Sequence, residues 1–201
     1  NVGGQEHFYL EGQACVALPQ EDGGMFVHTS SQHPSEVQKL VAEVLGLPIH
    51  AVTASVRRMG GGFGGKISIY LEPLAALLSK KSGQPVKLVM NRVEVFEASG
   101  PAAGSWIKVK MGATKDGKLT ACQAELALDA GAYPGSPAMS AAMCAFACYD
   151  YPNGLLDAYD VVVNKPKTQA YRAPGSPQAA YAVESVVDEL CEKLGIDPVE
   201  F

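Results

Sequence analysis

Residues 58–66 read RMGGGFGGK and are the most informative stretch of this 201-residue chain. Glycine loses more conformational freedom on folding than any other residue, so a run this dense needs a compensating gain. Apolar residues alternate over residues 52–56, which predicts a strand before the run, and the apolar spacing over residues 68–82 predicts a helix after it. A strand, a glycine loop and a helix N-terminus are typical of an anion-binding cradle.

Two nucleotide-binding motifs can be tested against this loop. Gly60, Gly62 and Gly65 satisfy GxGxxG, but residues 85–92 lack the acidic residue that a dinucleotide-binding fold places about 20 positions later. Residues 60–66 also satisfy GxxxxGK, yet the next residue is Ile67 where a P-loop needs Ser or Thr to hold magnesium. A tight structural turn is the third interpretation, and it rarely needs more than one or two glycines. Ligand binding by another mode is therefore favoured.

The rest of the chain predicts an α+β fold with mixed sheets and helices packed on one side, in two small layered subdomains. The apolar stripe of residues 34–45 predicts an amphipathic helix that Gly46 ends. The remaining expected elements are strands at residues 14–18, 25–29, 85–90, 107–111, 119–128 and 159–163, loops at 130–148 and 164–177, and a final helix that ends at Gly195. A subdomain boundary is expected near residues 84–105.

Composition excludes several classes of function. The net charge of -5 argues against nucleic acid as a partner, because phosphate binding needs a basic face. No apolar run reaches the roughly 18 to 20 residues of a membrane span. The five cysteines include no CxxC pair, which argues against a zinc site or an iron–sulfur cluster within the chain. Buried thiols in a reducing compartment are the favoured interpretation, and we expect a cytoplasmic protein.

Four segments together resemble one family. Residues 3–11 (GGQEHFYLE), 30–38 (SSQHPSEVQ), 58–66 and 170–178 (AYRAPGSPQ) are similar in order and spacing to the large, molybdenum-binding subunit of xanthine dehydrogenases and aldehyde oxidases. The resemblance implies that residues 1–201 are a fragment of the molybdopterin-binding domain, from the early part of a longer subunit. The first residue is not Met and a helix start follows Asp197, so both ends are expected to be internal to a longer protein.

The resemblance also implies roles for individual residues. Gln5 is expected to donate a hydrogen bond to an oxygen ligand of the molybdenum, and Gly62, Phe63 and Gly64 to lie over the cofactor. Arg172 is expected to bring a charged donor to the cofactor region. Outside the context of these motifs, a turn amide, core packing and a surface ion pair would explain Gln5, Phe63 and Arg172 equally well. The metal itself is expected to have no direct ligand from this chain.

The implied cofactor is molybdenum-molybdopterin, as such or in its cytosine dinucleotide form. The implied partners are the remainder of the molybdenum subunit, [2Fe-2S] clusters and FAD on other subunits or domains, and a small-molecule substrate. The general base of the family is a Glu beyond this segment, so the isolated chain is expected to be inactive. The alternative hypothesis is a catalytically inactive folded fragment or a binding module without cofactor.

Three departures from the family pattern bear on the substrate. The purine-oxidising members carry Glu where this chain has Ile67, in the substrate pocket, and an arginine near residues 139–140 that is missing here. The carbon monoxide dehydrogenases of the family carry a copper-binding Cys where this chain has Ala173. Aldehydes or less polar N-heterocycles are therefore the expected substrates, ahead of xanthine and carbon monoxide.

Overall fold

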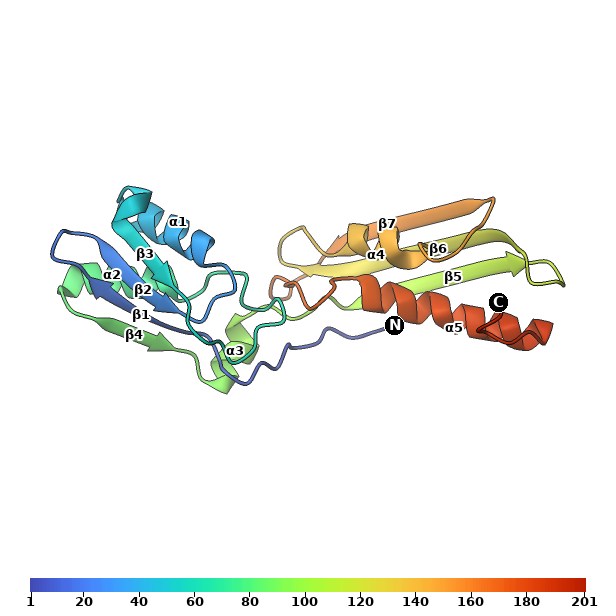
Figure 1. Cartoon of the computed structure of the whole chain (residues 1–201), viewed down its shortest axis with the longest axis horizontal. Coiled ribbons are helices and arrows are strands. Elements are labelled where there is room, and N and C mark those ends of the chain that lie inside the picture. Colours follow the sequence, from blue (N-terminus) through green and yellow to red (C-terminus); the bar gives the residue numbers. More distant parts are fainter. The chain divides into compact units, whose positions relative to one another are not determined.

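The computed structural model describes residues 1–201 as two compact units (Figure 1). Unit 1 comprises Asn1–Gln5 and Ala102–Phe201, and unit 2 comprises Glu6–Pro101. Each unit contains one sheet with both parallel and antiparallel neighbours. The predicted α+β fold with mixed sheets is therefore confirmed.

Unit 2 contains a sheet of strand order β3-β2-β1-β4 with two helices on one face. Its strands are β1 (Ala14–Pro19), β2 (Met25–Thr29), β3 (Val52–Ser55) and β4 (Val86–Val89), and its helices are α1 (Pro34–Leu45), α2 (Glu72–Ser82) and the short α3 (Arg92–Ala98). A 3-10 turn, η1 (Ile49–Ala51), precedes β3. The core lies between the sheet and helices α1 and α2, where Cys15, Ala17 and Val27 are buried with Val37 and Ala75. The opposite face of the sheet carries the intervening residues.

Two details of unit 2 differ from expectation. Helix α2 begins at Glu72 instead of residue 68, because the Glu72 carboxylate accepts hydrogen bonds from the N–H groups of Tyr70 and Leu71 and from the Thr29 hydroxyl. Helix α3 was not expected, although its capping box is visible in the sequence. The side chain of Asn91 accepts from the N–H of Glu94, and the Glu94 carboxylate accepts from the N–H of Asn91.

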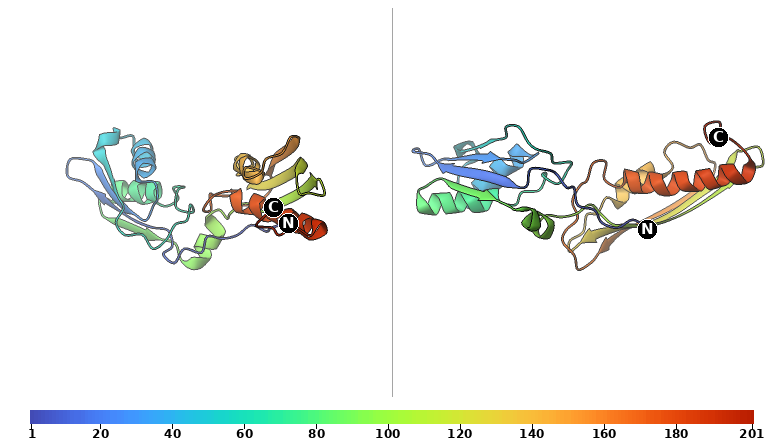
Figure 2. Two further views of the ribbon diagram at one scale, coloured as in Figure 1. Left: turned by 45° about the vertical axis from the view of Figure 1, so that its right-hand side comes forward. Right: turned by 90° about the horizontal axis from the view of Figure 1, so that it is seen from below.

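Unit 1 contains a sheet of strand order β5-β6-β7, formed by β5 (Ser105–Ala113), β6 (Leu119–Gly131) and β7 (Gly154–Val162). Helices α4 (Ala138–Ala145) and α5 (Ser176–Leu194) pack on it, and Figure 2 shows the long α5 running beside the strands. Residues 130–148, expected to be a loop, contain α4. Ala138, Ala141 and Ala145 recur at helical spacing and are buried, so the small side chains form a contact face and not a flexible segment.

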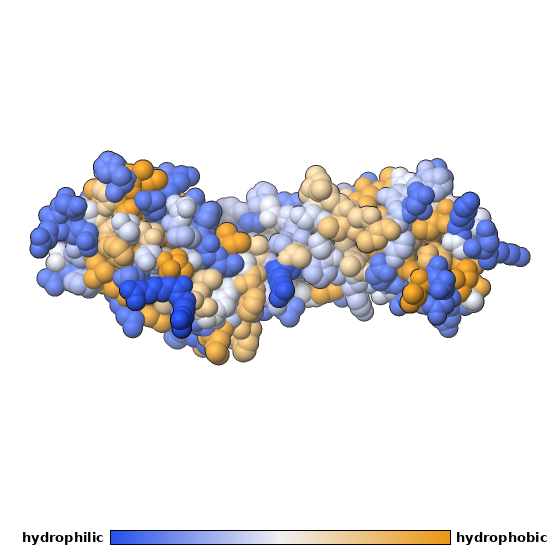
Figure 3. Space-filling view, viewed as in Figure 1, coloured by the Kyte–Doolittle hydropathy of each residue, from blue (hydrophilic) through white to orange (hydrophobic).

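Strand β7 begins at Gly154, five residues before the predicted start, because it follows the long β6 in parallel register from Cys122 onward. No helix is both long and apolar enough to cross a bilayer. Large hydrophobic side chains are exposed in both units, and the face drawn in Figure 3 has apolar patches between polar ones.

Candidate cofactor-binding site

Two side chains from distant parts of the sequence hold the glycine loop in unit 2. The Glu11 carboxylate accepts a hydrogen bond from the N–H of Gly60 at 2.9 Å, and the Glu11 N–H donates to the Gly60 carbonyl at 3.1 Å. Gln32 Oε1 accepts from the N–H of Gly64 at 2.8 Å and from that of Lys66 at 3.3 Å. Both ends of the loop are thus fixed, while the N–H groups of Gly61, Gly62 and Phe63 are not used in this way.

Close packing explains part of the glycine content. A Cβ on Gly62 would lie 2.6 Å from Gln32 Oε1, and a Cβ on Gly65 would lie 2.8 Å from both His7 Cγ and Tyr9 Cε1. Such distances are shorter than real Cβ contacts, so a larger residue would displace the groups that support the loop. The interpretation as a tight structural turn therefore accounts for some of these glycines.

The tip of the loop has features that internal packing does not explain. Phe63 has φ +53 and is 46% exposed, and Gly64 has φ +104. A bulky residue at positive φ is a conformational outlier, and such outliers are concentrated at ligand and active sites. An exposed aromatic ring beside unused N–H donors fits a planar, oxygen-rich cofactor that must approach the backbone closely. The residues present here therefore fit the group that the sequence implies.

Lys66, the lysine of the apparent P-loop motif, faces inward. Its side chain is fully buried, its Nζ lies 3.0 Å from Glu11 Oε2, and the ammonium lies 4.9 Å from the centroid of the Tyr9 ring. Burial lowers the pKa of Lys66, and the Glu11 carboxylate opposes that shift. Burial raises the pKa of Glu11, but hydrogen bonds from the Gly60 N–H and from Lys66 outweigh it and the net pKa is lowered. A lysine committed to this ion pair cannot reach a bound phosphate.

Gln5 lines a cavity of about 560 Å³ in unit 1. Its main chain is paired with Ala102, whose N–H donates to the Gln5 carbonyl at 2.8 Å. Gln178 lines the same cavity; its Nε2 donates to the Ala103 carbonyl at 3.4 Å, and its Oε1 is buried without a hydrogen-bond partner. A buried acceptor without a donor is costly, so this amide fits a ligand that donates a hydrogen bond.

Arg172 is exposed and is not among the residues that line this cavity. It lies in a constrained segment, because Ala173 has φ +58 and Gly175 has φ +84. A Cβ on Gly175 would lie 2.6 Å from the Pro137 carbonyl oxygen, so the segment packs closely against the start of α4. Arg172 is therefore an exposed cation on a fixed backbone.

The predicted site residues divide between the units: Gln5 and Arg172 belong to unit 1, and Gly62, Phe63, Gly64 and Ile67 belong to unit 2. Ile67 is 42% exposed and its N–H donates to the Gly64 carbonyl at 3.3 Å. Glu72, the acidic residue that follows Ile67 most closely, is buried and engaged at the start of α2, so it is not available to a ligand in place of a Glu at position 67.

The sequence interpretation missed the supporting residues Glu11, Gln32 and Lys66. The signal was present, since Glu11 ends the segment 3–11, Gln32 lies within 30–38, and Lys66 ends 58–66. The structure holds no group of three or more His, Cys, Asp and Glu side chains arranged for a metal ion. The candidate contacts to a cofactor are thus amide, guanidinium and backbone groups.

Known proteins are similar to this chain over almost its whole length. A xanthine dehydrogenase of Blastobotrys adeninivorans is 37% identical over 98% of the chain, and nicotinate hydroxylase hnxS of Emericella nidulans is 38% identical over 98%. The chain spans only 14% and 15% of their lengths.

Solved structures give the same result. An aldehyde oxidoreductase from Desulfovibrio gigas is 30% identical with a TM-score of 0.88, covering 99% of this chain and 22% of that one. A quinoline 2-oxidoreductase from Pseudomonas putida 86 is 27% identical with a TM-score of 0.91, covering 99% of this chain and 26% of that one. A profile described as the molybdopterin cofactor-binding domain matches residues 1–201. The chain belongs to the molybdopterin cofactor-binding domain family.

Proposed function

We propose that this chain forms the molybdopterin-binding part of a molybdenum hydroxylase that oxidises an aldehyde or an N-heterocycle, with water as the oxygen source. The observation that carries the proposal is the tip of the glycine loop, where Phe63 at positive φ is exposed and the N–H groups of Gly61, Gly62 and Phe63 have no hydrogen-bond acceptor within the chain. Relatives named as xanthine dehydrogenase, nicotinate hydroxylase and aldehyde oxidase support the same reaction class.

The proposed roles follow from the chemistry of each residue. When bound, the molybdenum cofactor supplies the redox centre that accepts electrons from the substrate. Gln5 provides a neutral amide donor for an oxygen atom, and Arg172 provides charge-assisted hydrogen bonds to a negatively charged group. Gly64 allows close approach of the backbone, Gly62 offers its N–H, and the Phe63 ring excludes water from that contact.

The remaining functions belong to other parts of the protein. We propose that the general base is a Glu outside this segment, that electrons leave through [2Fe-2S] clusters and FAD, and that the isolated chain is inactive. The cofactor is molybdopterin or its cytosine dinucleotide form. All five cysteines are unpaired, which supports a reducing, cytoplasmic location.

Ile67 leads to a prediction about the substrate. A hydrocarbon at this position cannot hydrogen-bond a polar purine, and a lost hydrogen bond to a charged group costs about 1.5 to 3 kcal/mol. We therefore expect the intact enzyme to show a higher kcat/KM for benzaldehyde than for xanthine. Ile67→Glu should raise the ratio of xanthine to benzaldehyde kcat/KM by roughly tenfold or more.

Ile49→Glu is the matched control, because Ile49 is also an exposed isoleucine of unit 2 and should leave the ratio unchanged. Xanthine as the clearly better substrate of the unaltered enzyme would contradict the proposed role of Ile67. Absence of turnover with every substrate of both classes would favour the alternative of an inactive folded module.

A further inference from the structure

The sheet of unit 2 carries a row of polar side chains on the face that its helices do not cover. In the strand register, Lys87 of β4 is opposite Val16 of β1, Val16 is opposite His28 of β2, and His28 is opposite Ser55 of β3. Alternate residues of a strand point to opposite faces. The neighbours of this row in sequence pack under the helices, so the row itself lies on the open face.

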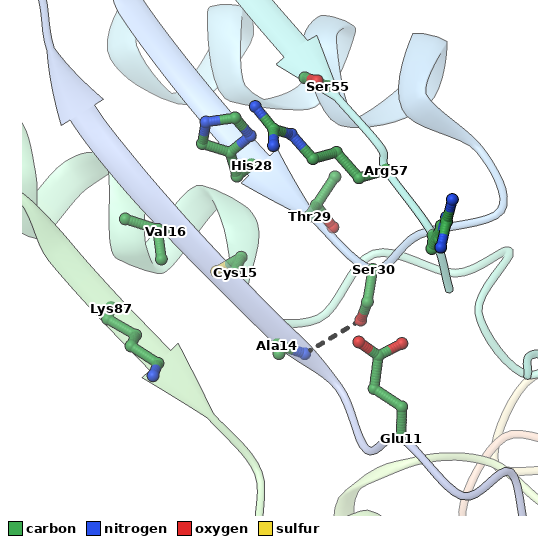
Figure 4. Close-up of a pocket in the computed structure, with 11 residues that line it drawn as sticks. Glu11, Ala14, Cys15, Val16, His28, Thr29, Ser30, Ser55, Arg57 and Lys87 are labelled. Atoms are coloured by element: carbon green, nitrogen blue, oxygen red, sulfur yellow. Dashed lines mark hydrogen bonds between the residues drawn. The ribbon is translucent and has the colours of Figure 1, made fainter. Parts of the chain in front are cut away.

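A groove of about 490 Å³ lies along this row (Figure 4). Small side chains form much of its floor: Ala14 and Val16 lie on β1, and Ser30 follows β2. Ser55 lies on the edge strand β3, next to His28 of β2. Long cationic side chains flank them: Arg57 and Arg58 follow β3, and Lys87 lies on the edge strand at the other side. The full lining is Glu11, Ala14, Cys15, Val16, His28, Thr29, Ser30, Ser55, Arg57, Arg58 and Lys87.

The cations of the groove are not neutralised within the chain. The ion pairs of the structure involve Lys39, Lys66 and Lys165, and none involves the two arginines or Lys87. Glu11 is the single carboxylate in the lining, and it is already bound to Lys66 Nζ and the Gly60 N–H. Three formally positive side chains therefore line one hollow from its two sides, and none of them is paired with a carboxylate.

We propose that this groove binds a small phosphorylated molecule. Guanidinium groups match the geometry of phosphate oxygens, and Lys87 adds a third positive charge. The Ser55 hydroxyl can donate a hydrogen bond from the floor. The volume falls in the range of small-molecule sites and exceeds what a phosphate group alone would fill, so the apolar floor at Ala14 and Val16 accommodates an organic portion.

Titration calorimetry of the intact protein with inorganic phosphate and with pyrophosphate, at constant ionic strength, tests this site. We expect Arg57→Gln and Lys87→Gln each to weaken binding by about tenfold, because each removes a charge-assisted hydrogen bond. Arg57→Lys should weaken binding less, since the charge remains and only the planar guanidinium group is lost.

Lys81→Gln is the control. Lys81 is exposed near the end of α2, outside the groove, and its replacement makes the same change in net charge. Its affinity should stay within about twofold of the unaltered protein.

Three outcomes would overturn the proposal. The first is that neither phosphate nor pyrophosphate binds detectably. The second is that the Arg57→Gln, Lys87→Gln and Lys81→Gln variants lose affinity equally, which would mean that the anion is attracted by the overall charge of the protein and not by the groove. The third is protection of Arg57 and Lys87 from phenylglyoxal and acetic anhydride in the intact protein without ligand, because another polypeptide segment would then fill the groove. Circular dichroism of each variant separates lost binding from lost folding, and Arg57→Lys keeps the test valid if Arg57→Gln does not fold.

Discussion

Replacing Gly64 with valine in the intact protein should greatly reduce its molybdenum and pterin content while most of the fold remains. Gly64 has φ +104, a conformation that a β-branched residue strongly avoids. The strain is on the order of 2 kcal/mol, which corresponds to roughly a thirtyfold change in an equilibrium constant. The N–H of Gly64 also anchors the loop to Gln32, so relief of the strain would move the tip of the loop.

The control for this variant is Gly46→Val. Gly46 has φ +64 at the end of α1, and a Cβ there would meet nothing within 4 Å. It therefore imposes a similar backbone strain on the same unit, at the end of α1 and outside the glycine loop. Metal analysis and pterin fluorescence of both purified variants give the answer. Full cofactor content in Gly64→Val would mean that this loop is not the cofactor cradle.

Replacing Glu11 with alanine should destabilise unit 2 by about 2 kcal/mol, more than replacing Lys66 with methionine. Removing one partner of a buried ion pair costs about 3 to 5 kcal/mol because an unpaired charge is left behind. We discount that figure because the Glu11 side chain is 39% exposed, whereas Lys66 is fully buried. Lys66→Met removes the buried charge itself and keeps the length of the side chain, so its cost should be below about 1 kcal/mol.

The pH dependence of these variants follows from the shifted pKa values. The pKa of Glu11 is lowered from 4.5, so its stabilising contribution is present above pH 4.5 and is lost as the pH falls through the folded pKa. The pKa of Lys66 is lowered from 10.5, so the unfolded state binds more protons just below that pH and stability rises with pH there. The difference in stability between the unaltered protein and Glu11→Ala should therefore become smaller below pH 4.5, and again as the pH approaches 10.5.

Hydrogen exchange of the amides in β1 and β2 measures the stability of unit 2 directly. Glu11→Ala should show the faster exchange at neutral pH, and Lys66→Met should lie close to the unaltered protein. The reverse order, with Lys66→Met the more damaged, would show that the ion pair stabilises more than the buried charge costs.

Much of the fold is predictable because local signals agree with tertiary packing. The stripe that ends at Gly46 gives α1, and the turn before Leu119 gives the hairpin of β5 and β6. Helix α4 was missed because the Gly, Ser and other small residues of 130–148 were taken to favour a loop, although alanine is a strong helix former and the buried alanines recur at helical spacing. The early start of β7 depends on pairing with β6, a contact that no local pattern shows.

The candidate site also combines features that the sequence predicts with features that depend on tertiary contacts. The position of the glycine loop is evident in the sequence, and so is its unsuitability as a P-loop. Its supporting residues lie within the segments that resemble the family, but their hydrogen bonds to the loop cannot be read from the sequence, because Glu11 bonds to Gly60 across 49 residues and Gln32 bonds to Gly64 across 32. The basic groove depends on the register of four strands, which brings together single residues that form no motif.

The most direct test of the central claim is the molybdenum and pterin content of the intact protein, produced in a host that makes the cofactor and is supplied with molybdate. The loop of residues 60–65 and the cavity beside Gln5 predict stoichiometric molybdenum together with an equal amount of pterin. A folded, intact protein that contains neither molybdenum nor pterin would contradict the assignment of a cofactor-binding function to this chain.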